Sequence, residues 1–358
     1  MAKNGDLHTA RSGKNDEFYT QYYDIEREMN AYLDYDPDVF RGKTVLLPCD
    51  DPEWSNFTKY FAARFEYLGL KKLISTSYAP QSKHNEEDLF SYQPTDIERN
   101  SDQFDAEKAL SRGKLFVLTS DMNRDGKIDI KDIGWTYLEG TGDFRTHEVT
   151  ALRNEADIII TNPPFSLFRE YMAWVVQPGK KFSVIGNMNA ITYKDIFPLI
   201  QGNALWPGPT ISSGDREFRV PDSYPLEAAG HRTDELGQKY IRVKGVRWFT
   251  NIDHGRRHQP LPLMTMKDNL KFNKKMKDKP SYDRYDNYDA IDVPFTNATP
   301  SDYDGIMGVP ISFLDKYCPA QFEIVGLDRY VEGNQTPNKR FTINGVEAYA
   351  RIAIRHKK

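Results

Sequence analysis

The stretch ADIIITNPPF, residues 156–165, decides the fold class of this 358-residue chain. Its apolar run is continuous, which is typical of a strand buried on both faces of a parallel sheet. The double proline then ends the strand, because proline has no N–H to donate to a neighbouring strand. A helix is predicted next at 167–176, followed by another strand at 181–187. This alternation of strand and helix predicts an α/β fold with a parallel sheet.

The same alternation precedes this stretch. Residues 43–48 and 70–79 are predicted strands, and the apolar spacing between them, ended by Gly69, predicts a helix. Residues 43–79 therefore have the dimensions of a βαβ unit. A helix is also predicted at 18–35, where the residues at spacings of three and four are Tyr22, Ile25, Met29 and Leu33. Further short strands are predicted at 115–119, 241–250, 311–314 and 322–327.

The composition limits the class of protein. Hydrophobic residues make up 39% and aromatic residues 13% of the chain, which is too much apolar material for a disordered protein. No stretch reaches the ~18 consecutive apolar residues of a membrane span, and the N-terminus lacks the apolar core of a signal peptide. The cysteines, Cys49 and Cys318, are too few for a disulfide framework or a four-cysteine zinc site. We therefore expect a soluble, cytoplasmic protein.

Charge is unevenly distributed along the chain, although the net charge is only -4. Residues 86–108 hold eight acidic residues against Arg99 and Lys108, and residues 84–112 lack periodicity, so an acidic insertion is expected there. Residues 239–279 hold twelve lysines and arginines against three aspartates. A segment this basic either contacts phosphate groups or forms a solvated charged face.

The tetrapeptide at the end of the central strand is the predicted catalytic segment: Asn162, Pro163, Pro164 and Phe165. In an open α/β sheet, ligands bind at the carboxyl ends of the strands, where this tetrapeptide is expected to lie. The Asn162 side-chain oxygen and the Pro163 carbonyl make a pair of acceptors suited to an exocyclic amino group. The Phe165 ring offers a surface on which a planar base can stack. The alternative is a structural turn in which Asn162 caps the next helix.

Four motifs together resemble the EcoRI-type adenine-specific DNA methyltransferases: NDEFYT at 15–20, LLPCDDPEWSNF at 46–57, EGTGDF at 139–144 and TNPPFSLFREY at 161–171. A chance match of all four in the family's order is far rarer than a match of any one. The resemblance implies a Rossmann-like class I methyltransferase fold, with a catalytic domain over 1–253 and an α+β target-recognition region over 254–358. It implies methyl transfer from S-adenosylmethionine to N6 of a flipped adenine in duplex DNA, with a cognate restriction endonuclease as a partner.

The resemblance also implies which residues hold the cofactor. They lie in the motif before the first helix, in the loop after the first strand, on the second strand and in the EGTGDF motif. The loop lacks the Gly-x-Gly bend of most methyltransferases and must turn differently. Ordinary helix-entry aromatics and a turn aspartate after Gly142 are the alternatives for the first and last motifs. The implied residues are Phe18, Tyr19, Thr20, Pro48, Cys49, Asp50, Asp51, Ser75, Asp143 and Phe144.

DNA contacts are expected from the basic region, which the resemblance favours as a phosphate-contacting surface. Trp248 or Phe249 would supply the second face of the base pocket, unless both are ordinary core aromatics. The other predicted DNA-binding residues are Arg256, Arg257, Lys271, Lys274, Lys275 and Lys277.

Residues 121–132, DMNRDGKIDIKD, have the spacing of a calcium-binding loop. Gly126 occupies the sixth position, but the twelfth is aspartate instead of the usual glutamate. The predicted ligands of a structural calcium ion are Asp121, Asn123, Asp125, Asp129 and Asp132. A turn rich in aspartate and glycine is the alternative.

Two other functions stay open from the sequence. NPP-aromatic motifs also occur in relatives that methylate RNA or a protein glutamine amide, so the methyl acceptor could differ. A non-catalytic DNA-binding or calcium-binding module could also keep the same fold, although the intact tetrapeptide argues against it.

Overall fold

The computed structural model describes residues 20–51, 55–79, 99, 101–211, 215–220, 230–277 and 279–357. They form two compact units. Unit 1 contains the described residues up to 187 together with 215–252, and unit 2 contains 188–211 together with 253–357. The predicted cofactor residues Phe18 and Tyr19 lie outside the described residues, as does most of the acidic segment. The described part of that segment includes a short helix, α8 (Ala106–Ser111).

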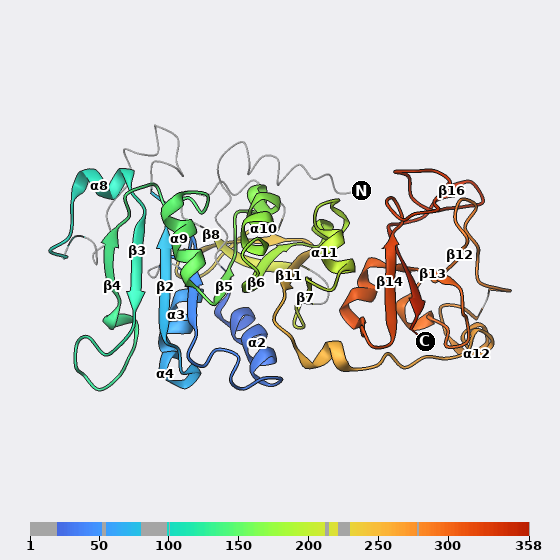
Figure 1. Cartoon of the computed structure of the whole chain (residues 1–358), viewed down its shortest axis with the longest axis horizontal. Coiled ribbons are helices and arrows are strands. Elements are labelled where there is room, and N and C mark those ends of the chain that lie inside the picture. The colour runs from blue at the N-terminus through green and yellow to red at the C-terminus, as the bar shows by residue number, and fades with distance from the viewer. Residues whose placement is uncertain are drawn as a thin grey trace. The chain divides into compact units, whose positions relative to one another are not determined.

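Unit 1 is built on a sheet whose centre is parallel (Figure 1). The parallel strands are β1 (Thr44–Leu47), β2 (Lys72–Ser77), β5 (Ile158–Thr161) and β6 (Lys181–Asn187). The antiparallel strands are β3 (Lys114–Leu118) and β4 (Gly134–Tyr137) beyond β2, and β11 (Val246–Thr250) beside β6. Within the unit the order is β4-β3-β2-β1-β5-β6-β11. This arrangement confirms the predicted Rossmann-like fold class.

The strand order places a topological switch between β1 and β5. The chain continues from β1 to β2 on one side, whereas β5 pairs with the other side of β1. Loops leave the carboxyl ends of two such strands in opposite directions, which opens the crevice where α/β sheets bind ligands. Every residue of β1 and β5 is buried, as the continuous apolar runs predicted.

Helices flank the strands of unit 1. They are α2 (Tyr22–Leu33), α3 (Asn56–Ala63), α4 (Phe65–Leu68), α9 (His147–Glu155) and α10 (Phe168–Val176). The predicted helix after β1 is divided at Arg64, and Gly69 ends it in the left-handed conformation with φ +61°. Gly186 of β6 lets α10 pack closely, because a Cβ there would lie 2.3 Å from the Phe168 ring.

Two of the sequence predictions for strands need correction. The predicted strand 241–250 is two strands, β10 (Lys239–Val243) and β11, joined by a turn in which Gly245 has φ +70°. β10 pairs with β8 (Arg216–Val220) and β9 (Arg232–Thr233) in a separate antiparallel sheet. Residues 311–314 are not a strand but part of the 3-10 helix η6 (Ile311–Lys316), because a short apolar run can be buried in either conformation.

Unit 2 contains a sheet in the order β12-β13-β17-β14. Its strands are β12 (Ala290–Asp292), β13 (Ile306–Pro310), β17 (Arg351–His356) and β14 (Phe322–Leu327), the last as predicted. The shorter elements are α11 (Phe197–Gln201), β7 (Trp206–Pro207), η4 (Gly255–His258), α12 (Met266–Phe272), β15 (Thr342–Ile343) and β16 (Val346–Glu347). A buried ion pair joins Arg351 to Asp292 at 2.8 Å, and the Tyr285 hydroxyl donates to the same carboxylate.

In the part of the chain that the structure describes, no helix has both the length and the apolar character required to cross a membrane.

Candidate active site

The predicted catalytic tetrapeptide directly follows β5, at the carboxyl edge of the sheet. Pro163 is buried, while Asn162, Pro164 and Phe165 are each partly exposed. The Pro164 carbonyl accepts a hydrogen bond from the Leu167 amide at 3.0 Å, which starts the 3-10 turn η2 (Phe165–Leu167). Among the backbone hydrogen bonds of the described residues, none ends on the Pro163 carbonyl. The bend is therefore fixed by its own backbone and keeps an acceptor available beside Asn162.

Phe165 makes an edge-to-face ring contact inside unit 1. Its ring centroid lies 6.4 Å from that of Phe218 on β8, at an interplanar angle of 89°. Phe218 is almost fully buried, whereas Phe165 is only partly covered. An edge-to-face contact supports one side of a ring and is compatible with stacking on its face. Stacking of a base on Phe165 stays a prediction.

The loop after β1, residues 48–51, is named here the cofactor loop. It turns without glycine, because Cys49 itself adopts the left-handed conformation with φ +72°. The Cys49 amide donates to the Thr76 hydroxyl at 3.3 Å, which holds this turn against the end of β2. A non-glycine residue in this conformation is costly and persists where the surroundings fix it, often at functional sites. Cys49 is not part of a disulfide.

Asp50 lies at the centre of a buried hydrogen-bond network. Its carboxylate contacts the Thr161 hydroxyl at 2.6 Å and accepts from the Ser55 hydroxyl at 2.7 Å. Its backbone carbonyl accepts from the hydroxyls of Thr58 and Ser75. Burial raises the pKa of Asp50 from 3.8 to about 7, although the bonds from Thr161 and Ser55 lower it. The strand-end network, defined as Pro48, Asp50, Ser55, Thr58, Ser75 and Thr161, joins β1, β2, β5 and α3.

This network contains residues that the sequence analysis missed. Ser55, Thr58 and Thr161 belong to no expected ligand set, and their role is visible only once distant segments meet. Ser75, implied as a cofactor residue by the resemblance, is fully buried and bonds to the Asp50 carbonyl. Ser55 also caps α3 by accepting from the Phe57 amide, and this cap was readable from the sequence.

Two tyrosine hydroxyls near the cofactor loop were also missed. The Tyr78 and Tyr171 hydroxyls are buried. Tyr171 has no hydrogen-bond partner among the described residues, whereas the Tyr78 hydroxyl lies close to the Cys49 side chain and the Phe144 backbone. Burial raises the pKa of each, and the electrostatic effect of Cys49 reaches both. Buried hydroxyls without a partner are rare in proteins and are usually satisfied by a ligand or by water. The Tyr171 hydroxyl lies near Asp50, and such hydroxyl and carboxyl groups can bond to the amino and hydroxyl groups of a ligand.

The two predicted cofactor residues of the EGTGDF motif, Asp143 and Phe144, lie in different environments. Both carboxylate oxygens of Asp143 accept from the Arg145 guanidinium, at 2.9 Å and 2.6 Å, and this ion pair lowers the pKa of Asp143 against the effect of burial. Phe144 is fully buried, with its ring edge-to-face against Tyr171 and Trp174 of α10. In this structure Asp143 is thus partly exposed and paired, and Phe144 is a core residue.

Two further cofactor predictions concern Thr20 and Asp51. Thr20 is buried, and its carbonyl accepts from the Asn56 side chain at 2.8 Å, which fastens the start of the described chain to α3. The Asp51 carbonyl accepts from the Ser55 amide at 2.7 Å, and its side chain is partly exposed. Both residues therefore lie next to the strand-end network.

The structure favours the alternative for Trp248 and Phe249. Both side chains are fully buried in β11. Trp248 packs edge-to-face against Phe57, and Phe249 packs against Phe168. A ring enclosed on all sides cannot stack on a base, so these two aromatics support the sheet.

The predicted DNA-binding residues of unit 2 divide into a buried and an exposed group. Arg257 is buried, with its guanidinium 3.4 Å from the centroid of the Trp206 ring and bonded to the Asn203 side chain. Such an enclosed cation cannot contact a phosphate without breaking these contacts. Exposed side chains belong to Arg256, Lys271, Lys274, Lys275 and Lys277. The four lysines, which follow or end α12, are named here the lysine segment.

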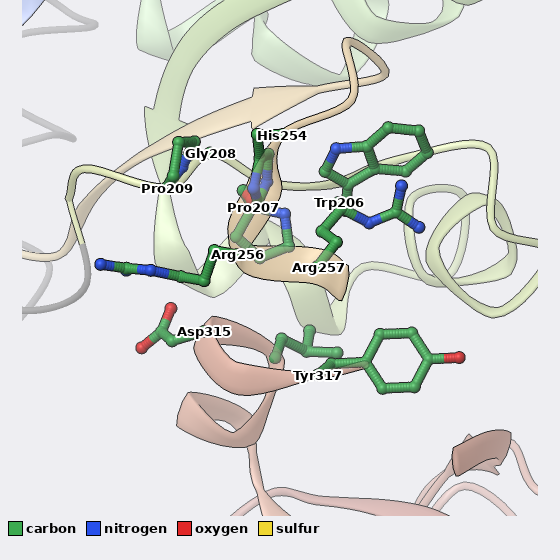
Figure 2. Close-up of a pocket in the computed structure, with 10 residues that line it drawn as sticks. Trp206, Pro207, Gly208, Pro209, His254, Arg256, Arg257, Asp315 and Tyr317 are labelled. Carbon is green, nitrogen blue, oxygen red and sulfur yellow. The ribbon is translucent and has the colours of Figure 1, made fainter. Parts of the chain in front are cut away.

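Unit 2 also contains a small pocket around His254 (Figure 2). Figure 2 shows the Arg257 side chain beside the Trp206 indole and Arg256 extending away from them, near Asp315. The His254 ring lies 3.4 Å from the Pro207 carbonyl, and burial lowers its pKa to about 4. The His254 ring is therefore neutral at physiological pH.

The structure does not support the predicted calcium site. Among the described residues, which include all of 121–132, no group of three or more acidic, histidine or cysteine side chains could hold a metal ion. The carboxylates instead accept from the loop's own amides: Asp121 from Gly126, and Asp132 from Met122, Asn123 and Asp129. These bonds lower the pKa of Asp132. The alternative, a self-bonded turn, agrees with this geometry.

Comparisons with known proteins agree with the motifs. The family model described as adenine-specific methyltransferase EcoRI matches residues 6–357. The chain is 40% identical to the type II methyltransferase M.EcoRI of Escherichia coli, over 100% of this chain and 99% of that protein. It is 34% identical to the type II methyltransferase M.MpnI of Mycoplasma pneumoniae, over 88% and 83% of the two chains. It is 31% identical to M.MgeORF184P of Mycoplasma genitalium, over 97% of each. No solved structure matches the chain significantly.

Proposed function

The chain belongs to the EcoRI family of adenine-specific methyltransferases, and we propose that it transfers a methyl group from S-adenosylmethionine to N6 of an adenine flipped out of a specific duplex DNA site. The observation that carries this proposal is the partly exposed Asn162–Phe165 bend, which lies at the switch between β1 and β5.

Asn162 and Pro163 are proposed to activate the acceptor nitrogen. Adenine N6 is conjugated with its ring and is a poor nucleophile. When the Asn162 side-chain oxygen and the Pro163 carbonyl accept its two hydrogens, the nitrogen moves toward tetrahedral geometry and its lone pair becomes localised. Phe165 is proposed to stack on the extruded base, which repays part of the few kcal/mol that flipping costs.

The cofactor is proposed to bind at the carboxyl ends of β1 and β2. When bound, S-adenosylmethionine supplies a methyl group activated by its sulfonium charge. The residues that would hold it are Asp50, Asp51, Tyr78 and Tyr171, with Asp143 at its adenine end once the pair with Arg145 opens. Holding the methyl donor in line with N6 is a large part of the catalysis in such a reaction.

The remaining parts of the proposal concern DNA and partners. The lysine segment would contact the phosphate backbone, and residues 254–358 would read the target sequence. A modification enzyme of this kind works beside a restriction endonuclease with the same recognition site, and we propose such a partner for this chain.

Transfer of tritium from labelled S-adenosylmethionine tests the acceptor class directly. Equal amounts of duplex DNA, RNA and protein are offered to the purified chain, and label is expected only in DNA, as N6-methyladenine. Sequencing modified adenines in DNA from cells that express the protein then gives the recognition site. Label in RNA or protein alone would reject the proposed acceptor.

A further inference from the structure

Thr161 links the cofactor loop to the catalytic bend. It is the last residue of β5, it immediately precedes Asn162, and its side chain is fully buried. Its hydroxyl lies 2.6 Å from the Pro48 carbonyl and 2.6 Å from the Asp50 carboxyl oxygen Oδ2. A single hydroxyl therefore contacts two residues of the loop that is proposed to hold the cofactor.

The number of available hydrogens shows whether these two distances fit a protonated or an ionised Asp50. A threonine hydroxyl has one hydrogen to donate and can accept through its lone pairs. It cannot donate to Pro48 and to an ionised Asp50 at the same time, and a contact of 2.6 Å between two acceptors without a hydrogen is repulsive. If Asp50 carries a proton on Oδ2, the carboxyl donates to Thr161 and Thr161 donates to Pro48. Both short contacts are then satisfied.

The groups around Asp50 favour the same form. The neighbouring polar side chains from α3 and β2 are the neutral hydroxyls of Ser55, Thr58 and Ser75. The titratable groups next to Asp50 are the Tyr171 hydroxyl and the neighbouring residues Cys49 and Asp51, none of which is cationic. Among the described residues, no lysine or arginine contributes to the raised pKa of Asp50.

We propose that Thr161 is a positioning residue that couples the cofactor loop to Asn162, and that the Asp50 carboxyl releases its proton to solvent when the cationic cofactor binds. The inference rests on the proposed use of S-adenosylmethionine, whose sulfonium and ammonium groups favour an ionised carboxylate nearby. Once its proton is lost, Asp50 can only accept hydrogen bonds. The single hydroxyl hydrogen of Thr161 can then be donated either to Asp50 or to Pro48, but not to both. This change in hydrogen bonding at Thr161 links the position of the cofactor loop to the position of Asn162, the first residue of the catalytic bend.

Proton release can be measured on the unmodified protein. Calorimetric titration with S-adenosylmethionine near pH 7, in buffers of different ionisation enthalpy, gives the number of protons released per cofactor bound. We expect a release between zero and one proton that falls toward zero as the pH is raised above 8. The Asp50→Asn variant should release none. Binding without any proton release would overturn the inference and leave the proposed function intact, whereas no binding at all would overturn the proposed function.

Substitution of Thr161 tests the coupling. Thr161→Val keeps the branched shape but removes the hydroxyl, and Thr161→Ser keeps the hydroxyl. We expect kcat to fall about tenfold in Thr161→Val, with little change in the KM for DNA, because a buried hydrogen-bond partner is left unsatisfied. Thr161→Ser should restore most of kcat and the wild-type pH profile.

A purely structural role gives a different pattern. Both variants would then lose thermal stability while kcat and its pH profile stay as in the wild type, and that result would contradict the coupling. If Thr161→Val does not fold, the calorimetric experiment on the wild type and Asp50→Asn still tests the inference.

Discussion

The strand-end network of unit 1 and the lysine segment of unit 2 use polar side chains in opposite ways. In the network, Asp50 and Thr161 are buried, and their partners come from separate strands and helices. In the lysine segment the charged ends face solvent, as at Lys274 and Lys277. Buried groups are screened little by salt, whereas exposed charges are screened within a Debye length of ~8–10 Å. We therefore expect the proposed chemistry of unit 1 to depend on burial and pH, and the proposed DNA binding of unit 2 to depend on salt.

Removing the Asn162 side chain should have the largest effect. We expect Asn162→Ala to lower kcat by about 100-fold or more, because a preorganised polar contact to the reacting group is lost. Binding of S-adenosylmethionine and the salt dependence of DNA binding should stay close to wild type. Asn162→Asp is the matched control, since it keeps an acceptor oxygen and should retain more activity than the alanine variant. Single-turnover methylation measures both, and unchanged turnover in Asn162→Ala would refute the catalytic assignment.

Making Asp50 permanently neutral should have the next largest effect. We expect Asp50→Asn to weaken cofactor binding about tenfold at pH 8, because a charge-assisted contact is lost. The folded state raises the pKa of Asp50 from 3.8 to about 7, so its contribution to stability is present below pH 4 and is lost as the pH rises through about 7. Thermal unfolding of the variant should lack that decline. A variant that follows the wild-type pH curve would contradict the buried-acid assignment.

The lysine segment should show a smaller effect that depends on salt. Lys274→Ala and Lys275→Ala should each lower the slope of log K against log salt by roughly one unit, if each lysine neutralises one phosphate. Fluorescence anisotropy with labelled duplex DNA at several salt concentrations measures this slope. Lys71→Ala, an exposed lysine of unit 1, is the control and should leave the slope unchanged. Equal slopes in all four proteins would remove the lysine segment from the DNA-binding surface.

His254 gives unit 2 a pH dependence opposite to that of Asp50. Burial lowers its pKa from 6.5 to about 4, so its contribution to stability is present above pH 6.5 and is lost as the pH falls through about 4. His254→Gln cannot take up a proton, and its unfolding temperature should change less between pH 7 and pH 4 than that of the wild type. His258→Gln, at an exposed position, is the control. Parallel pH curves for His254→Gln and the wild type would show that His254 titrates normally.

Calcium should have the smallest effect, because residues 121–132 bond to their own backbone. Neither added calcium nor a chelator should shift the unfolding temperature by more than about 1 °C, since only binding to the folded state stabilises it. A concentration-dependent rise with calcium, absent with magnesium, would reinstate the site that the spacing predicted.

Periodic and continuous apolar runs predicted the central sheet well. β1, β2, β5 and β6 all lie where the sequence placed them, since a strand buried on both faces leaves a strong apolar signal. Predictions from short or ambiguous runs were less accurate. Residues 311–314 form a 3-10 helix, and the aromatic pair Trp248–Phe249 supports the core. The sequence does not show whether the ring of an aromatic residue in a strand is enclosed or exposed. Only the packing in the folded structure shows this.

By itself the sequence determined the family, the α/β sheet and the position of the Asn162–Phe165 bend, because these depend on local patterns and on motifs in a fixed order. Only the tertiary structure decided which polar groups meet. Thr161 and Asp50 are far apart in the chain and form no motif, yet the strand order brings them within 2.6 Å. The tertiary structure also distinguishes two kinds of carboxylate. Asp132 accepts hydrogen bonds from its own loop, whereas Asp50 is buried and has partners from other elements. The physical reason is burial, which depends on the whole fold. Burial shifts the pKa of an ionisable side chain and requires each buried polar group to find a hydrogen-bond partner.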